Sequence, residues 1–199
     1  MDLRHSYRRA CKEDARDLAE LLEIAAEGIA TWLWQQSAAP GQSPLDVGET
    51  RAAREDANFS YKNAVLAERD GVTAAMLLAY RLPEPDPAEL AAIDELPPLL
   101  RPLCELEWQV PGSYYVNALA ARPGFRGQGL GSGLLEIARD LAPEAGCDTL
   151  SVQVFEQNDG AVRLYRRHGY AIVDQRPIVA HSCYPYDSSV LLMTRTVAS

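Results

Sequence analysis

The chain has 199 residues, of which 47% are hydrophobic and 24% are charged, a composition typical of one globular domain with a buried core. Its 28 acidic and 19 basic residues give a formal net charge of -9, so we expect no binding to nucleic acid or to an anionic membrane, because both need a cationic face. The longest apolar stretches, such as residues 74–80, are too short to cross a bilayer, and the amino-terminal residues lack the apolar segment of a signal peptide.

Hydrophobic spacing in the first part of the chain predicts helices and a β-hairpin. Apolar residues at helical spacing from Leu18 to Ile29 predict one long amphipathic helix. Asp70 and Gly71 supply the positive backbone angles of a tight turn between two apolar runs, which predicts a hairpin. The expected elements, in chain order, are a strand at 3–9, the long helix from about 13 to 29, a loop at 37–44, a helix at about 49–57, and strands at 64–68 and 72–80.

The remainder of the chain begins with an irregular segment at 82–110, which we treat as a divergent insertion in a single domain over residues 1–199. The elements expected in and after it are a short helix at 88–96, a strand at 114–120, a loop at 122–129, a helix at 131–141 that ends before Pro143, a strand at 149–155, a helix from Asn158 to Gly169, and strands at 170–175 and 189–194. Alternating strands and helices predict an α/β or α+β fold, in which helices pack on the faces of a mixed sheet.

Five glycines stand between the predicted strand at 114–120 and the helix that follows, at positions 124, 127, 129, 131 and 133. So many glycines are costly for folding unless a ligand needs the bare backbone, and amides at a helix amino terminus attract anions. Arg126 adds a planar cation that suits phosphate. The stretch from Arg122 to Arg139 contains three arginines and one acidic residue, Glu136, which predicts a positive region. A tight turn for close helix packing is the alternative, but the arginine and the strand-turn-helix context favour a phosphate site. No Lys-Ser or Lys-Thr pair follows, which excludes a nucleotide phosphate loop, and Ser132 stands where a dinucleotide motif needs glycine.

Two motifs resemble those of the GNAT superfamily of acyl-CoA-dependent N-acyltransferases. The first is the pattern Arg/Gln-x-x-Gly-x-Gly/Ala, present here as RGQGLG from Arg126 to Gly131. The second is NDGAVRLYRRHGY from Asn158 to Tyr170, which contains the family's asparagine, helix tyrosine and closing glycine-aromatic pair. The resemblance implies a mixed, mostly antiparallel central sheet of about six to seven strands flanked by helices.

The resemblance also implies a site for acetyl-CoA, the acyl donor and co-substrate. The pyrophosphate would lie on the turn formed by Arg126, Gly127, Gln128, Gly129, Leu130 and Gly131, with Ser132 adding a hydroxyl; we call residues 126–132 the glycine turn. The pantetheine arm would pair with the backbone of the preceding strand at Leu119, Ala120 and Ala121. Asn158 is either a further contact to this arm or an ordinary helix cap.

Tyr165 is the candidate catalytic acid, and it would also contact the cofactor. A phenol with a pKa of ~10 stays protonated at neutral pH and can donate to the departing thiolate. The alternative is a core aromatic, because Tyr165 shares a helical stripe with Leu164 and Ala161.

Glu105 and Glu107 are candidates for the base that deprotonates the amine, if they share one face of an extended segment. One alternative is that these two residues form a solvated acidic edge. The other is that a chain of water molecules removes the proton.

We therefore expect an N-acetyltransferase that transfers an acetyl group from acetyl-CoA to a primary amine of a small molecule or peptide, by direct attack in a ternary complex. No cysteine lies in either motif, so an acyl-enzyme is not expected. The four cysteines and three histidines are widely spaced in the sequence, which predicts no metal site. The cysteine spacing also predicts no disulfide framework, and therefore a reducing, cytoplasmic location. A nonenzymatic CoA-binding sensor and a nucleotide-dependent oxidoreductase are the alternatives. The resemblance is compatible with a homodimer, and the sequence leaves the acceptor and the length of the acyl group open.

Overall fold

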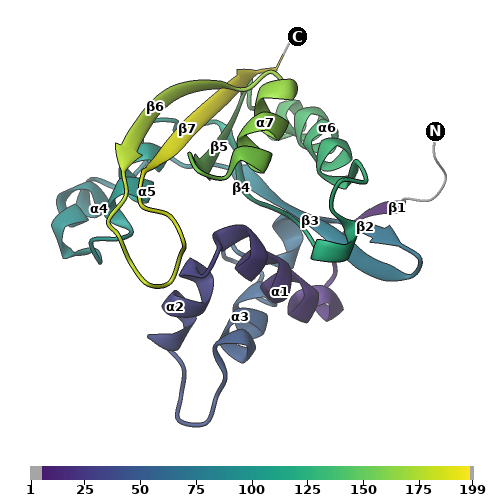
Figure 1. Cartoon of the computed structure of the whole chain (residues 1–199), viewed down its shortest axis with the longest axis horizontal. Helices are drawn as coiled ribbons and strands as arrows, with labels where there is room; N and C mark the ends of the chain where they lie inside the picture. The colour runs from purple at the N-terminus through teal and green to yellow at the C-terminus, as the bar shows by residue number, and fades with distance from the viewer. Residues whose placement is uncertain (1–5, 198–199) are drawn as a thin grey trace. The chain divides into compact units, whose positions relative to one another are not determined.

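The computed structural model describes residues 6–197, in which seven strands form one mixed sheet in the order β1-β2-β3-β4-β5-β7-β6 (Figure 1). Pairing is antiparallel from β1 to β3 and from β5 through β7 to β6, whereas β4 and β5 are parallel. The strands are β1 (Ser6–Arg9), β2 (Ala64–Arg69), β3 (Val72–Arg81), β4 (Tyr114–Ala121), β5 (Thr149–Phe155), β6 (Ala171–Pro177) and β7 (Ser189–Thr196). The expected mixed, mostly antiparallel sheet with flanking helices is confirmed, although residues 3–5 of the predicted first strand lie outside the described residues.

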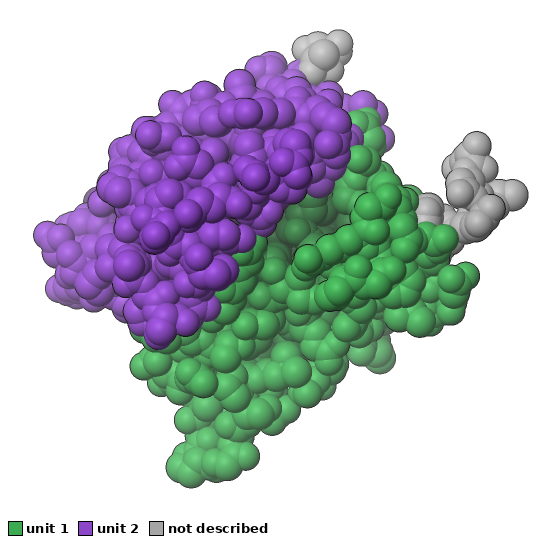
Figure 2. All heavy atoms as spheres, in the orientation of Figure 1, with its two compact units in different colours: residues 1–79, 118–136 green, residues 80–117, 137–199 purple. Residues whose placement is uncertain are grey.

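The chain divides into two compact units, which Figure 2 shows in different colours. Unit 1 contains Met1–Ala79 and Ala118–Glu136, and unit 2 contains Tyr80–Asn117 and Ile137–Ser199. The α-helices are α1 (Ala15–Ala26), α2 (Ile29–Gln35), α3 (Pro44–Ala52), α4 (Pro87–Ala91), α5 (Arg101–Glu107), α6 (Leu130–Glu144) and α7 (Asp159–Arg167).

The main core of unit 1 forms between α1 and the β2–β3 hairpin. Leu18 and Leu21 of α1 are fully buried and belong to one cluster with Leu66 of β2 and Met76 of β3. Full burial of a leucine contributes about 2 kcal/mol, so this contact stabilises the helix that its apolar spacing predicts. The hairpin turn has φ angles of 52° at Asp70 and 75° at Gly71, which confirms the predicted tight turn.

Three predicted helix boundaries were wrong, each because of local backbone chemistry. The long first helix is two helices, because Glu27 (φ 52°) and Gly28 (φ 106°) both adopt left-handed angles that end the hydrogen-bond ladder of α1. Helix α3 begins at Pro44, earlier than expected, because Ser43 caps it and proline suits the first helical position. Helix α6 contains Pro143 instead of ending before it, because a proline near the carboxyl end removes only one hydrogen bond.

Gly48 of α3 lies directly against the ring of Trp34, which is 2% exposed. A Cβ at position 48 would stand 2.6 Å from the Trp34 Cη2 atom, closer than packed atoms allow. We expect Gly48→Ala to lower the free energy of unfolding by about 1–3 kcal/mol, as measured by urea denaturation. Gly160→Ala in α7 is the matched control, because the nearest atom to its Cβ would be 3.8 Å away, and equal stability of the Gly48 variant and the wild type would contradict the prediction.

In unit 2, β5 pairs with β7 along its whole length, from Thr149 to Phe155. Helix α5 covers this part of the sheet: Leu106 is fully buried in a cluster with Val190 and Leu192 of β7. The Gln153 side chain of β5 donates a hydrogen bond to the Leu103 carbonyl of α5 at 2.9 Å. The segment at 82–110 is therefore anchored to the sheet by its second half, and the expected helix at 88–96 is two short pieces, α4 and a 3-10 helix at Ile93–Glu95.

Candidate functional site

The glycine turn of unit 1 leaves a row of backbone donors free at the start of α6. Gly127 and Gly129 have φ angles of 73° and 85°, and a Cβ on either would meet no atom within 4 Å. Glycine is thus needed for the left-handed backbone, and the space beside it is open. The N–H groups of residues 128–132 have no hydrogen-bond acceptor in the described part of the chain. Free amides at a helix amino terminus, where the macrodipole is positive, are suited to bind an anion.

The predicted positive region around this turn is reduced to Arg126. Arg122 forms ion pairs with Asp17 (2.5 Å) and Glu20 (2.8 Å), and Arg139 pairs with the next residue at 3.0 Å. The predicted positive region, with three arginines against Glu136 alone, is therefore smaller than expected, because acidic residues outside the stretch pair with two of the arginines. Arg126 is exposed and forms no ion pair with a residue from 6 to 197.

The strand residues predicted to pair with pantetheine lie at the end of β4. Leu119 and Ala121 are partly buried, Ala120 is 7% exposed, and the Ala121 carbonyl accepts a hydrogen bond from Arg126 Nε at 3.3 Å. The parallel pairing of β4 with β5 covers Tyr114 to Val116, the first three residues of the strand.

Asn158 of unit 2 caps α7, because its Oδ1 atom accepts a hydrogen bond from the Ala161 N–H at 3.1 Å. This confirms the structural role that was one of the two interpretations of Asn158. Its contact with a cofactor remains a prediction.

Tyr165 of α7 is buried, with 5% of its surface exposed, and its ring contacts Tyr170 edge-on at a centroid distance of 5.6 Å. Burial raises the pKa of Tyr165 above its ordinary value, because the phenolate would lose its hydration. The hydroxyl is therefore protonated at neutral pH, and it makes no hydrogen bond to a described residue. The structure confirms the burial of this side chain, while its catalytic role remains a prediction.

Glu105 and Glu107 do not share one face of an extended segment, because both lie in helix α5. Helical geometry turns residues two positions apart about 200° from each other. Glu105 is exposed and pairs with Arg176 at 3.2 Å, whereas Glu107 is partly buried and forms neither a hydrogen bond nor an ion pair with a described residue. The two candidate bases therefore differ in the structure: the carboxylate of Glu105 is paired with Arg176, and that of Glu107 has no partner among the described residues.

Burial, and in second place the charge of Glu89, raise the pKa of Glu107 to about 7. The negative charge of Glu107 in turn raises the pKa values of Tyr80, Cys104 and Tyr115, for each of which burial is the first cause. A carboxylate with a pKa near neutrality can accept a proton at pH 7 and release it again. Sequence reasoning assigned no role to Tyr80, which lies on β3, or to Cys104, which lies three residues before Glu107 in α5.

These groups fall into two sets, each inside one unit. The glycine turn and the end of β4 belong to unit 1, whereas Glu107, Tyr165 and Asn158 belong to unit 2. Within unit 2, burial raises the pKa of Tyr115, and the charge of Glu107 adds to this rise.

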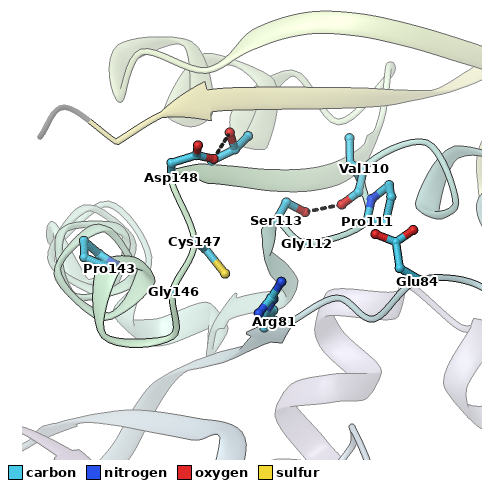
Figure 3. A pocket seen from close by; sticks show the side chains of 11 residues that line it. Arg81, Glu84, Val110, Pro111, Gly112, Ser113, Pro143, Gly146, Cys147 and Asp148 are labelled. Carbon is cyan, nitrogen blue, oxygen red and sulfur yellow. Dashed lines mark hydrogen bonds between the residues drawn. The ribbon is translucent and has the colours of Figure 1, made fainter.

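A surface pocket of about 690 Å³ in unit 2 contains none of the predicted site residues. It lies where β3 ends and where β4 and β5 begin, and Figure 3 shows the Cys147 thiol turned toward Arg81 there. Burial raises the pKa of Cys147, and the Arg81 charge partly opposes this rise. Glu84 and Asp148 line the same pocket, so it carries both signs of charge.

No group of three or more metal-ligating side chains occurs among residues 6–197. Over the same residues, every helix is too short or too polar to cross a membrane.

A family model described as the acetyltransferase (GNAT) family matches residues 26–170. Among curated proteins, the uncharacterized N-acetyltransferase YdgE of Bacillus subtilis (strain 168) is 34% identical over 62 residues, which cover 31% of this chain and 40% of that protein. The match therefore spans less than half of that relative.

Solved structures share the fold over nearly the whole chain. An N-acetyltransferase from Staphylococcus aureus Mu50 has a TM-score of 0.63 at 18% identity, covering 96% of this chain and 100% of that one. The protein yncA from Salmonella typhimurium, solved with acetyl-CoA, has a TM-score of 0.63 at 17% identity, covering 98% and 95%. An apo agmatine N-acetyltransferase has a TM-score of 0.68 at 18% identity, covering 97% and 99%. At these identities the likeness establishes the fold alone.

Proposed function

Because the chain belongs to the GNAT family of acetyltransferases, we propose that it transfers an acetyl group from acetyl-CoA to a primary amine of a small molecule or peptide. The observation that carries this proposal is the set of free amides at residues 128–132, beside a guanidinium without an acidic partner. Such a turn suits a diphosphate, and CoA carries one. In this proposal one acetyltransferase domain extends over residues 1–199, with 82–110 as its divergent insertion, and acts in the cytoplasm, as a homodimer.

We propose that acetyl-CoA is held by three parts of the chain. The glycine turn binds the diphosphate, and the Ser132 hydroxyl adds one donor. The pantetheine amides pair with the backbone of Leu119, Ala120 and Ala121, which lie beyond the three residues of β4 that pair with β5. Asn158 contacts the same arm in addition to capping α7.

The chemistry is direct attack in a ternary complex. The amine nitrogen forms a bond to the thioester carbonyl carbon, and the carbon–sulfur bond breaks. Glu107 takes the proton that the nitrogen must lose, because an alkylammonium with a pKa of ~10 is otherwise charged at pH 7. Tyr165 donates its proton to the departing thiolate. Glu107 is preferred to Glu105 as the base, because the latter is already paired with Arg176.

The test is thiol release from acetyl-CoA with a panel of primary amines, together with calorimetry against CoA and NAD. Amine-dependent thiol release supports the transferase. Tight binding of CoA without turnover on any amine would instead indicate a sensor, and binding of NAD but not CoA would indicate an oxidoreductase.

Tyr165→Phe is expected to lower kcat about 100-fold, because the thiolate then leaves without a proton donor. Thiol release under saturating acetyl-CoA and amine measures this effect. Tyr170→Phe is the matched control, since it removes a hydroxyl from the ring in edge contact with Tyr165 and should leave kcat within about threefold. A Tyr165 variant with wild-type turnover would remove the proposed acid from the mechanism.

A further inference from the structure

The surface pocket of unit 2 is a second place in this molecule where a ligand fits. Its volume is about 690 Å³, within the range of pockets that hold small molecules. The wall is formed by the segment that follows β3, the loop that precedes β4, and the turn between α6 and β5. None of the lining residues belongs to the proposed acetyl-transfer site, so the fold leaves this pocket without an assigned role.

Backbone hydrogen bonds hold the wall of the pocket in place. The Leu82 N–H donates to the Ser113 carbonyl at 2.9 Å, and the Gly112 N–H donates to the Leu82 carbonyl at 2.8 Å. These two bonds join the segment after β3 to the loop before β4. In the turn before β5, the Cys147 N–H donates to the Ala142 carbonyl at 2.9 Å. A wall that is already ordered lowers the entropic cost of binding a ligand.

Three charged side chains line the pocket without neutralising one another. Arg81 ends β3, Glu84 follows it in the chain, and Asp148 precedes β5 (Figure 3). None of the three forms an ion pair with a residue from 6 to 197. The guanidinium lies along the backbone of Gly112, because a Cβ there would stand 3.7 Å from Arg81 Nη2. The pocket thus presents one cation and two carboxylates that have no counterion in the described part of the chain.

This pattern of charges fits a ligand that carries both signs. An anion alone would be repelled by the two carboxylates, and a cation alone would be repelled by Arg81. Apolar surface from Val110, Pro111 and Pro143 completes the wall and suits an aliphatic group.

We propose that this pocket binds a free α-amino acid with an aliphatic side chain, whose carboxylate is held by Arg81 and whose ammonium group is held by Glu84 and Asp148. The planar fork of a guanidinium suits a carboxylate. All three side chains are exposed, so the loss of either kind of contact should weaken binding about fivefold. The inference does not depend on the proposed acetyl transfer.

The test is isothermal titration calorimetry with L-leucine and with 4-methylpentanoate, which is the same molecule without its amino group. The wild type should bind L-leucine at least about fivefold more tightly than 4-methylpentanoate. Arg81→Gln should weaken the binding of both ligands about fivefold. The double variant Glu84→Gln with Asp148→Asn should weaken L-leucine by a similar factor and tighten 4-methylpentanoate, because the repulsion of its carboxylate is removed.

Arg163→Gln is the matched control, because it makes the same change at an exposed arginine of unit 2 outside the pocket. The nearest acidic group to Arg163 is that of Asp159, at 3.9 Å, and the variant should bind L-leucine as the wild type does. Asparagine suits position 148, because its side-chain oxygen can still accept the Thr149 hydroxyl, which Asp148 Oδ1 now accepts at 3.0 Å.

No binding of L-leucine at up to about 10 mM would overturn the inference. Equal affinity for the two ligands would also overturn it, because the two carboxylates would then hold no ammonium group. Unchanged affinity for L-leucine in Arg81→Gln, with the fold intact by circular dichroism, would place the amino acid at another site and reject this pocket. None of these results bears on thiol release from acetyl-CoA, which tests the proposed transfer separately.

Discussion

Replacing Arg126 by Ala and Gly129 by Glu together should abolish measurable binding of CoA, with a loss of affinity of at least about 100-fold. The double variant removes the guanidinium that has no acidic partner and puts a carboxylate where the amides of residues 128–132 now have no acceptor. Loss of a charge-assisted contact at such a site costs about 2–5 kcal/mol, and repulsion of the diphosphate adds to that cost. Isothermal titration calorimetry with CoA measures the effect directly.

Gly41→Glu is the matched control for this variant. Gly41 has a φ angle of 83° and open space around its Cα atom, as Gly129 does, and both residues belong to unit 1. The control therefore carries the same backbone strain and the same added charge on a different loop, and it should bind CoA as the wild type does. Retained affinity in the double variant, with the fold intact by circular dichroism, would reject the assignment of the glycine turn.

Glu107→Gln should lower kcat/KM for the amine by about 100-fold or more, because the variant has no group to accept the ammonium proton. The wild-type rate should also depend on pH with a defined sign. Glu107 works only when deprotonated, and its pKa is raised to about 7, so kcat/KM should rise as pH increases through about 7 and level off above it. The variant should lose this rise. A pH series of initial rates measures both effects.

Glu105→Gln is the matched control for the base, because it removes the same charge from the same helix. It breaks an exposed ion pair with Arg176, and such pairs contribute little, so we expect kcat/KM within about twofold of the wild type. If Glu105→Gln lost activity while Glu107→Gln kept it, the two roles would be exchanged. Activity in both variants would indicate proton transfer through water.

The parts of the fold that depend on neighbouring residues could be predicted from the sequence. The β2–β3 hairpin needs the positive φ angles of Asp70 and Gly71, and the start of α7 needs the cap of Asn158. The glycine turn belongs to the same class, because its free amides follow from glycine positions and from the start of a helix. The predicted helix boundaries were wrong where two local signals competed. At Gly28 the apolar spacing typical of a helix continues toward Ile29, although the backbone there adopts a left-handed angle that ends the helix.

The charge state of the candidate site depended on residues far apart in the sequence. Arg122 is neutralised by Asp17, 105 positions away, and Glu105 by Arg176, 71 positions away. Sequence alone therefore determined the motifs, the order of the elements and the position of the anion-binding turn, since spacing and backbone chemistry encode them locally. Only the tertiary structure decided that Glu107 is the carboxylate left unpaired and Arg126 the arginine left free, because burial and ion pairing depend on which distant side chains the fold brings into contact.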